Sequence, residues 1–171
     1  HEQMPTMSDL HDVLVNMKGA QSLAMRLEKY TQGVFSGFVN HRTNIETHNT
    51  LTTYNIRDLE DELRPIAMYV ILQHLWNEMR HELKRRYVVI DEAWVMMAHE
   101  DAASFVYGLA KRCRKYYTGL TTITQDISDF MASRYGKPIV TNSSLQLLLR
   151  QSPASIDVIR DTFYLTDQEK F

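Results

Sequence analysis

Only one cysteine, Cys113, occurs among the 171 residues of the chain. A single thiol excludes an intrachain disulfide and a zinc site built from cysteines, and it fits a reducing, intracellular setting. The longest unbroken apolar stretch runs from Ile66 to Leu72, far too short to cross a membrane. The formal net charge is -2, so the chain has no excess of positive charge, which argues against a globally basic nucleic-acid binder.

The remaining composition is that of an ordinary folded domain, because 44% of the residues are apolar and 23% are charged. From residue 50 onward, β-prone runs alternate with helical patterns. This alternation predicts an α/β fold with a three-layer, mostly parallel sheet. The expected strands cover residues 50–56, 87–90, 119–124 and 145–149. Helices are expected to begin at residue 57, with Pro65 in the first turn of a longer one, at 100–116, through 127–131 and after Ser152, with a turn at 135–138.

Residues 1–33 are predicted to form a separate helical subdomain, and residues 34–171 the α/β part. Thr6 and Asp9 resemble a capping box at the start of the first helix, and two helical patterns follow. A short β-like stretch is expected at 34–39, so the boundary near residue 33 is soft. At the other end of the chain, Thr166 and Glu169 resemble a second capping box.

The most informative segment is Tyr87–Trp94, in which an apolar, β-prone run ends in the adjacent acids Asp91 and Glu92. Buried strands of parallel sheets read as continuous hydrophobic runs, and open α/β sheets bind ligands at the carboxyl ends of their strands. In nucleotide hydrolases, one acid at this place holds magnesium, usually through water, and a second polarises the attacking water. The alternative is a strand that runs into an ordinary polar turn.

A second predicted strand, Gly119–Thr124, ends in Gln125 and Asp126. An amide at a strand end can hydrogen-bond both a water and a γ-phosphate oxygen, which suits a sensor of nucleotide state. The alternative is that Asp126 simply caps the next helix, and both interpretations can hold together. Two polar strand ends separated by one helix favour the layout of a nucleotide-hydrolase sheet.

Arg112 and Arg114 lie in a basic helix end, Lys111–Lys115. The simplest interpretation is a solvated helix C-terminus that its dipole stabilises. An arginine from a neighbouring subunit can instead stabilise charge on a γ-phosphate. This segment should lie at the edge opposite the strand carboxyl ends, where it could not reach its own nucleotide, so such a role would have to act in trans.

Arg150 follows the apolar run at 145–149. It is therefore expected at the carboxyl end of a strand, near the two acids, where it could act on the nucleotide of its own subunit. The alternative is a salt bridge to an acid such as Asp91 or Asp126.

Four blocks stand out by their order and spacing: Arg86–Trp94, Ala110–Tyr116, Gly119–Asp126, and Asn142–Ser144 with Leu147–Gln151. Together they resemble the ATPase domain of conjugative type IV secretion systems, in particular the VirB-type fourth component and its TraC and TraE relatives. The resemblance covers roughly residues 50–171. The helical start at Pro5–Leu10 also resembles the helical insert of that family.

The resemblance implies a RecA-like core of the HerA–FtsK branch that hydrolyses ATP with Mg²⁺, usually as a hexamer. It implies that Asp91 holds the magnesium through water and that Glu92 is the catalytic base. Gln125 resembles the sensor glutamine, and Arg114 the arginine finger that acts in trans. Arg112 is a weaker candidate for the finger, and Arg150 is a candidate for contact with the γ-phosphate.

The resemblance also implies partners and a location. The partners would be other secretion components at the inner membrane, and the chain would lie in the cytoplasm, at the cytoplasmic face of the bacterial membrane. The transported substrate, which could be DNA, protein or pilin, stays open because no segment of the sequence reads bases.

The family uses a phosphate loop of the pattern G-x-x-x-x-G-K-[ST], which none of the six glycines of this chain forms. We therefore expect the C-terminal part of a longer protein, with an incomplete sheet, weak ATP binding and little hydrolysis on its own. The main alternative is a non-catalytic docking module of a secretion complex. A third interpretation, a DEAD-box-like helicase, is disfavoured because Thr-Ile-Thr-Gln stands where a Ser-Ala-Thr motif is expected.

Overall fold

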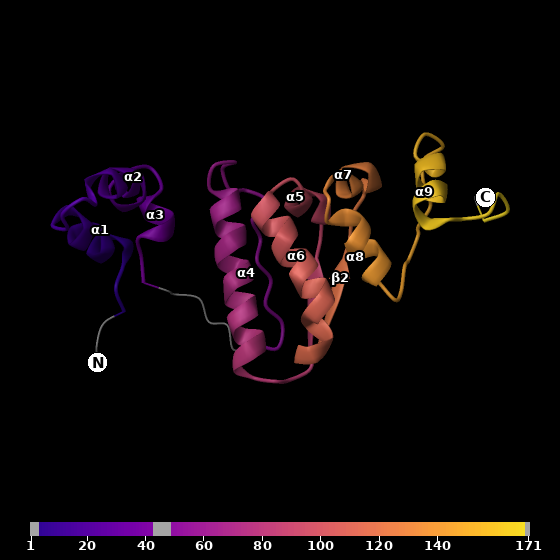
Figure 1. Ribbon diagram of the computed structural model, residues 1–171, viewed down its shortest axis with the longest axis horizontal. Coiled ribbons are helices and arrows are strands. Elements are labelled where there is room, and N and C mark those ends of the chain that lie inside the picture. Colours follow the sequence, from indigo (N-terminus) through magenta and orange to yellow (C-terminus); the bar gives the residue numbers. More distant parts are fainter. Residues whose placement is uncertain (1–3, 43–48, 170–171) are drawn as a thin grey trace. The chain divides into compact units, whose positions relative to one another are not determined.

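The computed structural model describes residues 4–42 and 49–169, and the chain divides into two compact units, His1–Asn55 and Ile56–Phe171 (Figure 1). This division falls after the boundary that we expected near residue 33. The reason is that α3 (Ser36–Val39) packs against α2 (Gln21–Thr31). The ring of Phe35, just before α3, stacks on Tyr30 of α2 with the ring centroids 5.9 Å apart.

The first unit begins with α1 (Met7–Val15), and the regular elements of its described residues are helices. The predicted capping box forms, because the backbone N–H and the hydroxyl of Thr6 both donate to Asp9 Oδ2, at 2.6 and 2.8 Å. The β-like stretch expected at 34–39 is wrong, since a short helix forms there. No strand lies beside it within residues 4–42, so a helical turn is what satisfies its backbone groups locally.

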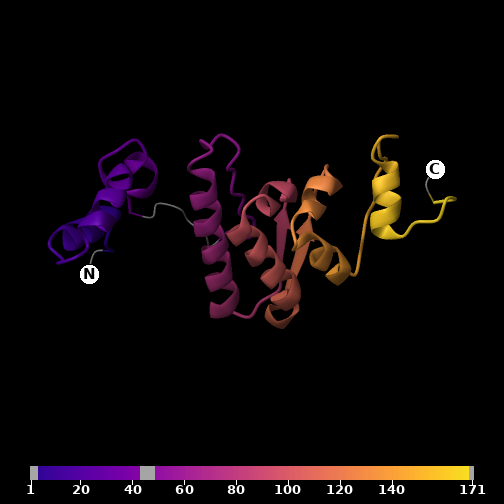
Figure 2. The ribbon, with the colours of Figure 1, turned by 45° about the horizontal axis from the view of Figure 1, so that its top comes forward.

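The second unit contains the sheet and most of the helices (Figures 1 and 2). Its longest helix, α4 (Arg64–His81), packs against α6 (Glu100–Arg112). The rings of Trp76 and Phe105 meet edge to face between these two helices, with centroids 6.2 Å apart. In chain order the elements are α4 (Arg64–His81), β1 (Arg86–Ile90), α5 (Ala93–Met97), α6 (Glu100–Arg112), the 3-10 helix η1 (Cys113–Tyr116), β2 (Thr118–Thr122), α7 (Ile127–Ala132), α8 (Gly136–Asn142) and α9 (Ile156–Phe163).

Strands β1 and β2 pair in parallel, with Arg86 opposite Thr118 and Ile90 opposite Thr122. This pairing confirms the predicted α/β class and the parallel arrangement of the two strands that carry the polar ends. A parallel pair needs a crossover connection, and α5, α6 and η1 supply it. The carboxyl ends of both strands therefore lie at one edge of the sheet and their amino ends at the other.

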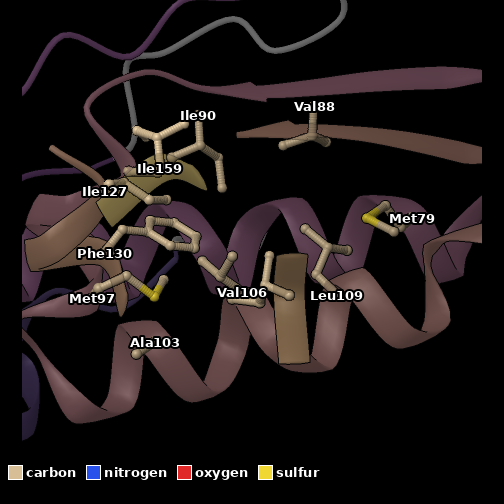
Figure 3. Close-up of a cluster of buried hydrophobic side chains, with 12 residues drawn as sticks. Met79, Val88, Ile90, Met97, Ala103, Val106, Leu109, Ile127, Phe130 and Ile159 are labelled. Atoms are coloured by element: carbon tan, nitrogen blue, oxygen red, sulfur yellow. The ribbon is translucent and has the colours of Figure 1, made fainter. Parts of the chain in front are cut away.

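The core of this unit lies against one face of the sheet. Val88 and Ile90 of β1 point into it, toward Val106 and Leu109 of α6 (Figure 3). The alternate residues Tyr87 and Val89 lie on the opposite face and are 86% and 61% exposed. Helices α4, α5, α7, α8 and α9 supply further core residues, which include Met79, Met97, Phe130, Ile139 and Ile159.

Two of the expected strands are wrong. Residues 50–56 and 145–149 have no strand structure, and Leu145 and Leu147 are 86% and 82% exposed. A β-prone run becomes a strand only when a neighbouring strand satisfies its backbone groups. In the part of the chain that the structure describes, the sheet holds only β1 and β2, and neither run pairs with the free edge of either strand.

Two other boundaries also differ from expectation. The helix expected over 57–63 does not form, since turns lie there, whereas the longer helix with Pro65 in its first turn forms as α4 from Arg64. The turn expected at 135–138 is instead the start of α8. Pro138 is tolerated there because it lies in the first turn, and Ile139 is buried against the core.

The C-terminal region follows the prediction more closely. Helix α9 forms after Ser152, and the backbone N–H and hydroxyl of Thr166 donate to Glu169 Oε2 at 2.9 and 2.8 Å, as in a capping box. Across residues 4–42 and 49–169, no helix combines the length and the apolar character that a membrane crossing needs.

Candidate functional site

The polar residues that follow β1 and β2 meet at one place, which we call the carboxyl edge (residues 91–94 and 123–126). The pairing continues one step past the strands, since Ile123 N–H donates to Ile90 O at 2.8 Å and Ala93 N–H donates to Ile123 O at 2.8 Å. The two chains separate only after these bonds. Glu92 and Gln125 are therefore held on adjacent chain segments at the end of the sheet.

Glu92 has a left-handed backbone, with φ 48° and ψ 47°. Few residues other than glycine adopt this conformation, which costs on the order of 1–3 kcal/mol. The conformation is fixed from both sides. Ile90 belongs to the sheet before Glu92, and Ala93 is fully buried at the start of α5 after it. The turn directs the Glu92 side chain to the carboxyl edge rather than into the helix.

Both carboxylate oxygens of Glu92 accept a hydrogen bond. Gln125 Nε2 donates to Glu92 Oε1, and Trp94 Nε1 donates to Glu92 Oε2 at 2.6 Å. Hydrogen bonds to an ionised carboxylate are stronger than those between neutral groups. The structure thus brings together two of the predicted site residues, Glu92 and Gln125, which are 33 positions apart in the sequence.

Asp91 is exposed at the same edge. Its Oδ1 accepts a hydrogen bond from the backbone N–H of Glu92 at 2.9 Å, and its other oxygen has no partner within the described residues. No group of three His, Cys, Asp or Glu side chains that could hold a metal occurs in residues 4–42 and 49–169. A single available carboxylate nevertheless fits Mg²⁺, which usually keeps several waters and takes one or two carboxylates together with substrate phosphates.

Asp126 serves the next helix rather than the edge itself. Its Oδ1 accepts from Asp129 N–H at 3.0 Å, so it is the N-cap of α7. The helix-cap interpretation of Asp126 is therefore confirmed, and Gln125 is the residue of this pair that turns toward Glu92.

The predicted arginines Arg112 and Arg114 lie at the opposite end of the strands, which we call the amino edge (residues 82–86 and 112–118). The Arg112 side chain is engaged within the chain, because Nε donates to Gly108 O at 3.1 Å and the guanidinium lies over the ring of Trp76, 4.7 Å from its centroid. Arg114 is exposed in η1, and among the described residues its guanidinium has no hydrogen-bond or ion-pair partner.

Arg150 is not where the sequence indicated. It lies in an exposed segment without regular structure, because residues 145–149 do not form a strand. It makes no salt bridge to Asp91 or Asp126 in the described part of the chain. Its expected position at a strand end, beside the two acids, is therefore wrong for this structure.

Trp94 bonds to Glu92 at the carboxyl edge but was not predicted from the sequence as a site residue. The available signal was an aromatic N–H donor two positions after an acid at a strand end. An indole usually finds a hydrogen-bond partner when it is partly buried. The direction of its N–H depends on the left-handed turn at Glu92, which no sequence pattern announced.

Comparisons with known proteins place this geometry in a context. A family model described as the TraG P-loop domain matches residues 11–171. The solved structure of VirB4 of Thermoanaerobacter pseudethanolicus is similar at 25% sequence identity with a TM-score of 0.81, over 97% of this chain and 48% of that one. The chain thus spans about half the length of that protein. No curated protein sequence matches it.

Proposed function

This chain belongs to the TraG P-loop domain family, and on that basis we propose that it forms part of the ATPase motor of a type IV secretion or conjugative transfer system. The observation that carries the proposal is the contact between Glu92 and Gln125 at the carboxyl edge. An acid and an amide that meet at the carboxyl end of a parallel sheet suit the activation of water beside a nucleotide.

Each residue of the carboxyl edge then has a role in ATP hydrolysis. Glu92 takes a proton from the attacking water, whose oxygen bonds to the γ-phosphorus while the bond to the bridging oxygen of ADP breaks. Gln125 orients that water and contacts a γ-phosphate oxygen. Asp91 would hold Mg²⁺ through water, and the ion when bound neutralises charge that develops on the phosphates.

The 171 residues contain no phosphate-loop motif. We infer that the loop is supplied by another part of a longer polypeptide, in keeping with the 48% coverage of the VirB4 chain. Without the backbone amides and lysine of that loop, the chain alone should bind ATP weakly and hydrolyse little of it.

Arg114 is the group that we propose to act on a neighbouring subunit. It is exposed, it lies at the amino edge, and the described residues offer it no partner. Each strand is five residues long, so the two edges lie roughly 16 Å apart along the strands. An arginine side chain is too short to span that distance. A head-to-tail ring, such as a hexamer, would bring the Arg114 of one copy to the nucleotide of the next.

The remaining assignments rest on the family. Arg112 is the weaker candidate for the finger because its guanidinium already stacks on Trp76. Arg150 could reach a γ-phosphate only if residues 145–149 join a larger sheet in the longer protein. Other secretion components at the cytoplasmic face of the inner membrane, and a DNA or protein substrate, are the partners that we propose.

The test is ATP turnover by the full-length protein that contains this chain. Glu92→Gln should lower turnover about 100-fold or more, the usual contribution of a general base, while ATP binding is retained. Glu100→Gln is the matched control, since Glu100 bonds to Arg134 and Tyr135 and not to a residue of the carboxyl edge, and its variant should keep near-normal turnover. Unchanged turnover in Glu92→Gln would reject the hydrolytic role and favour a docking module.

A further inference from the structure

Trp94 is an apolar residue whose single polar atom points at the proposed base. Its indole Nε1–H donates to Glu92 Oε2 at 2.6 Å. The indole is half-buried and packs against the core, and it belongs to α5, in which Ala93 and Met97 are buried. A large ring set in this way has little freedom, so its N–H is a fixed donor.

The two donors to Glu92 differ in how easily they can move. Gln125 is exposed and its amide stands on a flexible side chain, whereas the indole of Trp94 is packed. A nucleotide at the carboxyl edge would compete for the Gln125 amide, because a γ-phosphate oxygen is also a strong acceptor. Nothing in this arrangement would draw the indole N–H away from Oε2.

We propose that Trp94 is a positioning residue that holds Glu92 Oε2 and thereby leaves Oε1 as the oxygen that accepts the proton from water. This inference rests on the proposed function. When Gln125 turns to the phosphate, Oε1 becomes free while the carboxylate stays in place. The water proton then bonds to Oε1, the water oxygen bonds to the γ-phosphorus, and the bond between that phosphorus and ADP breaks.

The consequence is a defined kinetic signature. Trp94 touches neither ATP nor water in this scheme, so its loss should lower kcat and leave the KM for ATP unchanged. Without the indole N–H the carboxylate can rotate, and only a fraction of its orientations present an oxygen to the water. A reacting group that is misplaced by about 1 Å can cost a large part of the rate.

The experiment compares two replacements of Trp94 in the full-length protein. Trp94→Phe keeps an aromatic ring but has no donor. Trp94→His keeps a five-membered ring whose Nε2, in one ring orientation, falls where the indole Nε1 stands. We expect kcat to fall about tenfold or more for Phe, the size of one hydrogen bond to a charged group, and to recover in part for His.

Two further variants complete the design. Tyr135→Phe is the matched control, because it also removes one ring donor to a glutamate, the bond from Tyr135 to Glu100 Oε1 at 3.0 Å, without touching the carboxyl edge. Its kcat should stay within about twofold of the unmodified protein. Adding Trp94→Phe to Glu92→Gln should cause no further loss, since the group that Trp94 positions is already gone.

The outcomes separate this inference from the proposed function. Full turnover in Glu92→Gln would reject both. An inactive Glu92→Gln together with a Trp94→Phe variant within twofold of normal kcat would overturn the role of Trp94 alone. Equal losses for Phe and His would also overturn it, because packing would then explain the effect. If the Phe variant does not fold, Trp94→Leu takes its place as the variant without a donor.

Discussion

At the carboxyl edge, side chains that follow the two different strands, Glu92 and Gln125, bind each other. At the amino edge, each arginine either contacts a group nearby in its own chain or has no partner among the described residues. Arg86 donates to Glu82 O at 2.6 Å, and Arg112 stacks on Trp76. Both edges belong to the same pair of strands, β1 and β2. The two edges therefore differ only in the residues that precede and follow these strands. This difference teaches that this chain by itself brings together an acid and an amide at the carboxyl edge, while at the amino edge Arg114 has no hydrogen-bond or ion-pair partner among the described residues.

Each edge also contains one residue with a left-handed backbone. Glu92 follows β1 with φ 48°, and Tyr117 precedes β2 with φ 52°. The side chain of Tyr117 is 63% exposed, whereas that of Glu92 is bonded at both oxygens. The same backbone strain therefore only turns the chain at the amino edge, and at the carboxyl edge it also directs a functional group.

The largest expected effect concerns how rigidly each edge is supported. A Cβ added at Gly136 would run into the backbone carbonyl of Phe130 in α7, the helix that follows Gln125, whereas one added at Gly119 would meet the exposed ring of Tyr87. Backbone cannot move aside cheaply. We expect Gly136→Ala to lower the free energy of unfolding by about 2–3 kcal/mol and Gly119→Ala to change it by less than about 0.5 kcal/mol.

Urea unfolding of the two variants measures this difference directly. Equal losses for the two glycines would mean that α7 yields as readily as the Tyr87 ring. The support of the carboxyl edge would then be no firmer than that of the amino edge.

A smaller effect should appear at the two left-handed residues. Glycine adopts a left-handed backbone without strain. The free energy of unfolding of Glu92→Gly should therefore be about 1 kcal/mol higher than that of Glu92→Ala, and the same difference is expected between Tyr117→Gly and Tyr117→Ala. Both variants of Glu92 should lose ATP turnover in the full-length protein. If alanine were as stable as glycine at position 92, the backbone there would be relaxed, and strain would not hold the side chain.

The smallest effect is a pH dependence at the amino edge. The hydrogen bond from Lys84 and the charges of Lys84 and Arg86 hold the pKa of Glu82 below its ordinary value. A lowered pKa in the folded state means that this pair stabilises the protein at neutral pH. That contribution is lost as the pH falls through the lowered folded-state pKa.

Carbon-13 NMR titration of the Glu82 carboxylate checks this expectation. Lys84→Met should move the midpoint up toward the ordinary value of a glutamate, and the exposed position of the pair keeps the change in stability small. An unchanged midpoint in Lys84→Met would show that the pair does not hold Glu82, and that the cations of the amino edge are freer than the structure indicates.

The sequence correctly predicts the two strands that pair with each other, β1 and β2. The strands expected at 87–90 and 119–124 form at Arg86–Ile90 and Thr118–Thr122, because each satisfies the backbone of the other. The run at 50–56 is as β-prone, and the run at 145–149 is as apolar. Both stay irregular, since strand formation depends on a neighbour that local propensity does not reveal.

The candidate site also has one part that the sequence predicts and another that depends on the folded structure. The positions of Asp91, Glu92 and Gln125 at one edge could be predicted from strand ends, because parallel strands share their carboxyl edge. The bond from Trp94 could not, since it depends on a left-handed turn that glutamate rarely adopts. Arg150 was misplaced because its position depended on a strand that the described residues do not complete.

The central claim is that the carboxyl edge of one copy works with the amino edge of another, and mixing two inactive full-length variants tests it most directly. Glu92→Gln keeps Arg114, and Arg114→Ala keeps Glu92. In a randomly mixed ring, about a quarter of the interfaces combine an intact carboxyl edge with an intact Arg114, so turnover should recover toward a quarter of normal. No recovery on mixing, or normal turnover of Arg114→Ala by itself, would contradict the account.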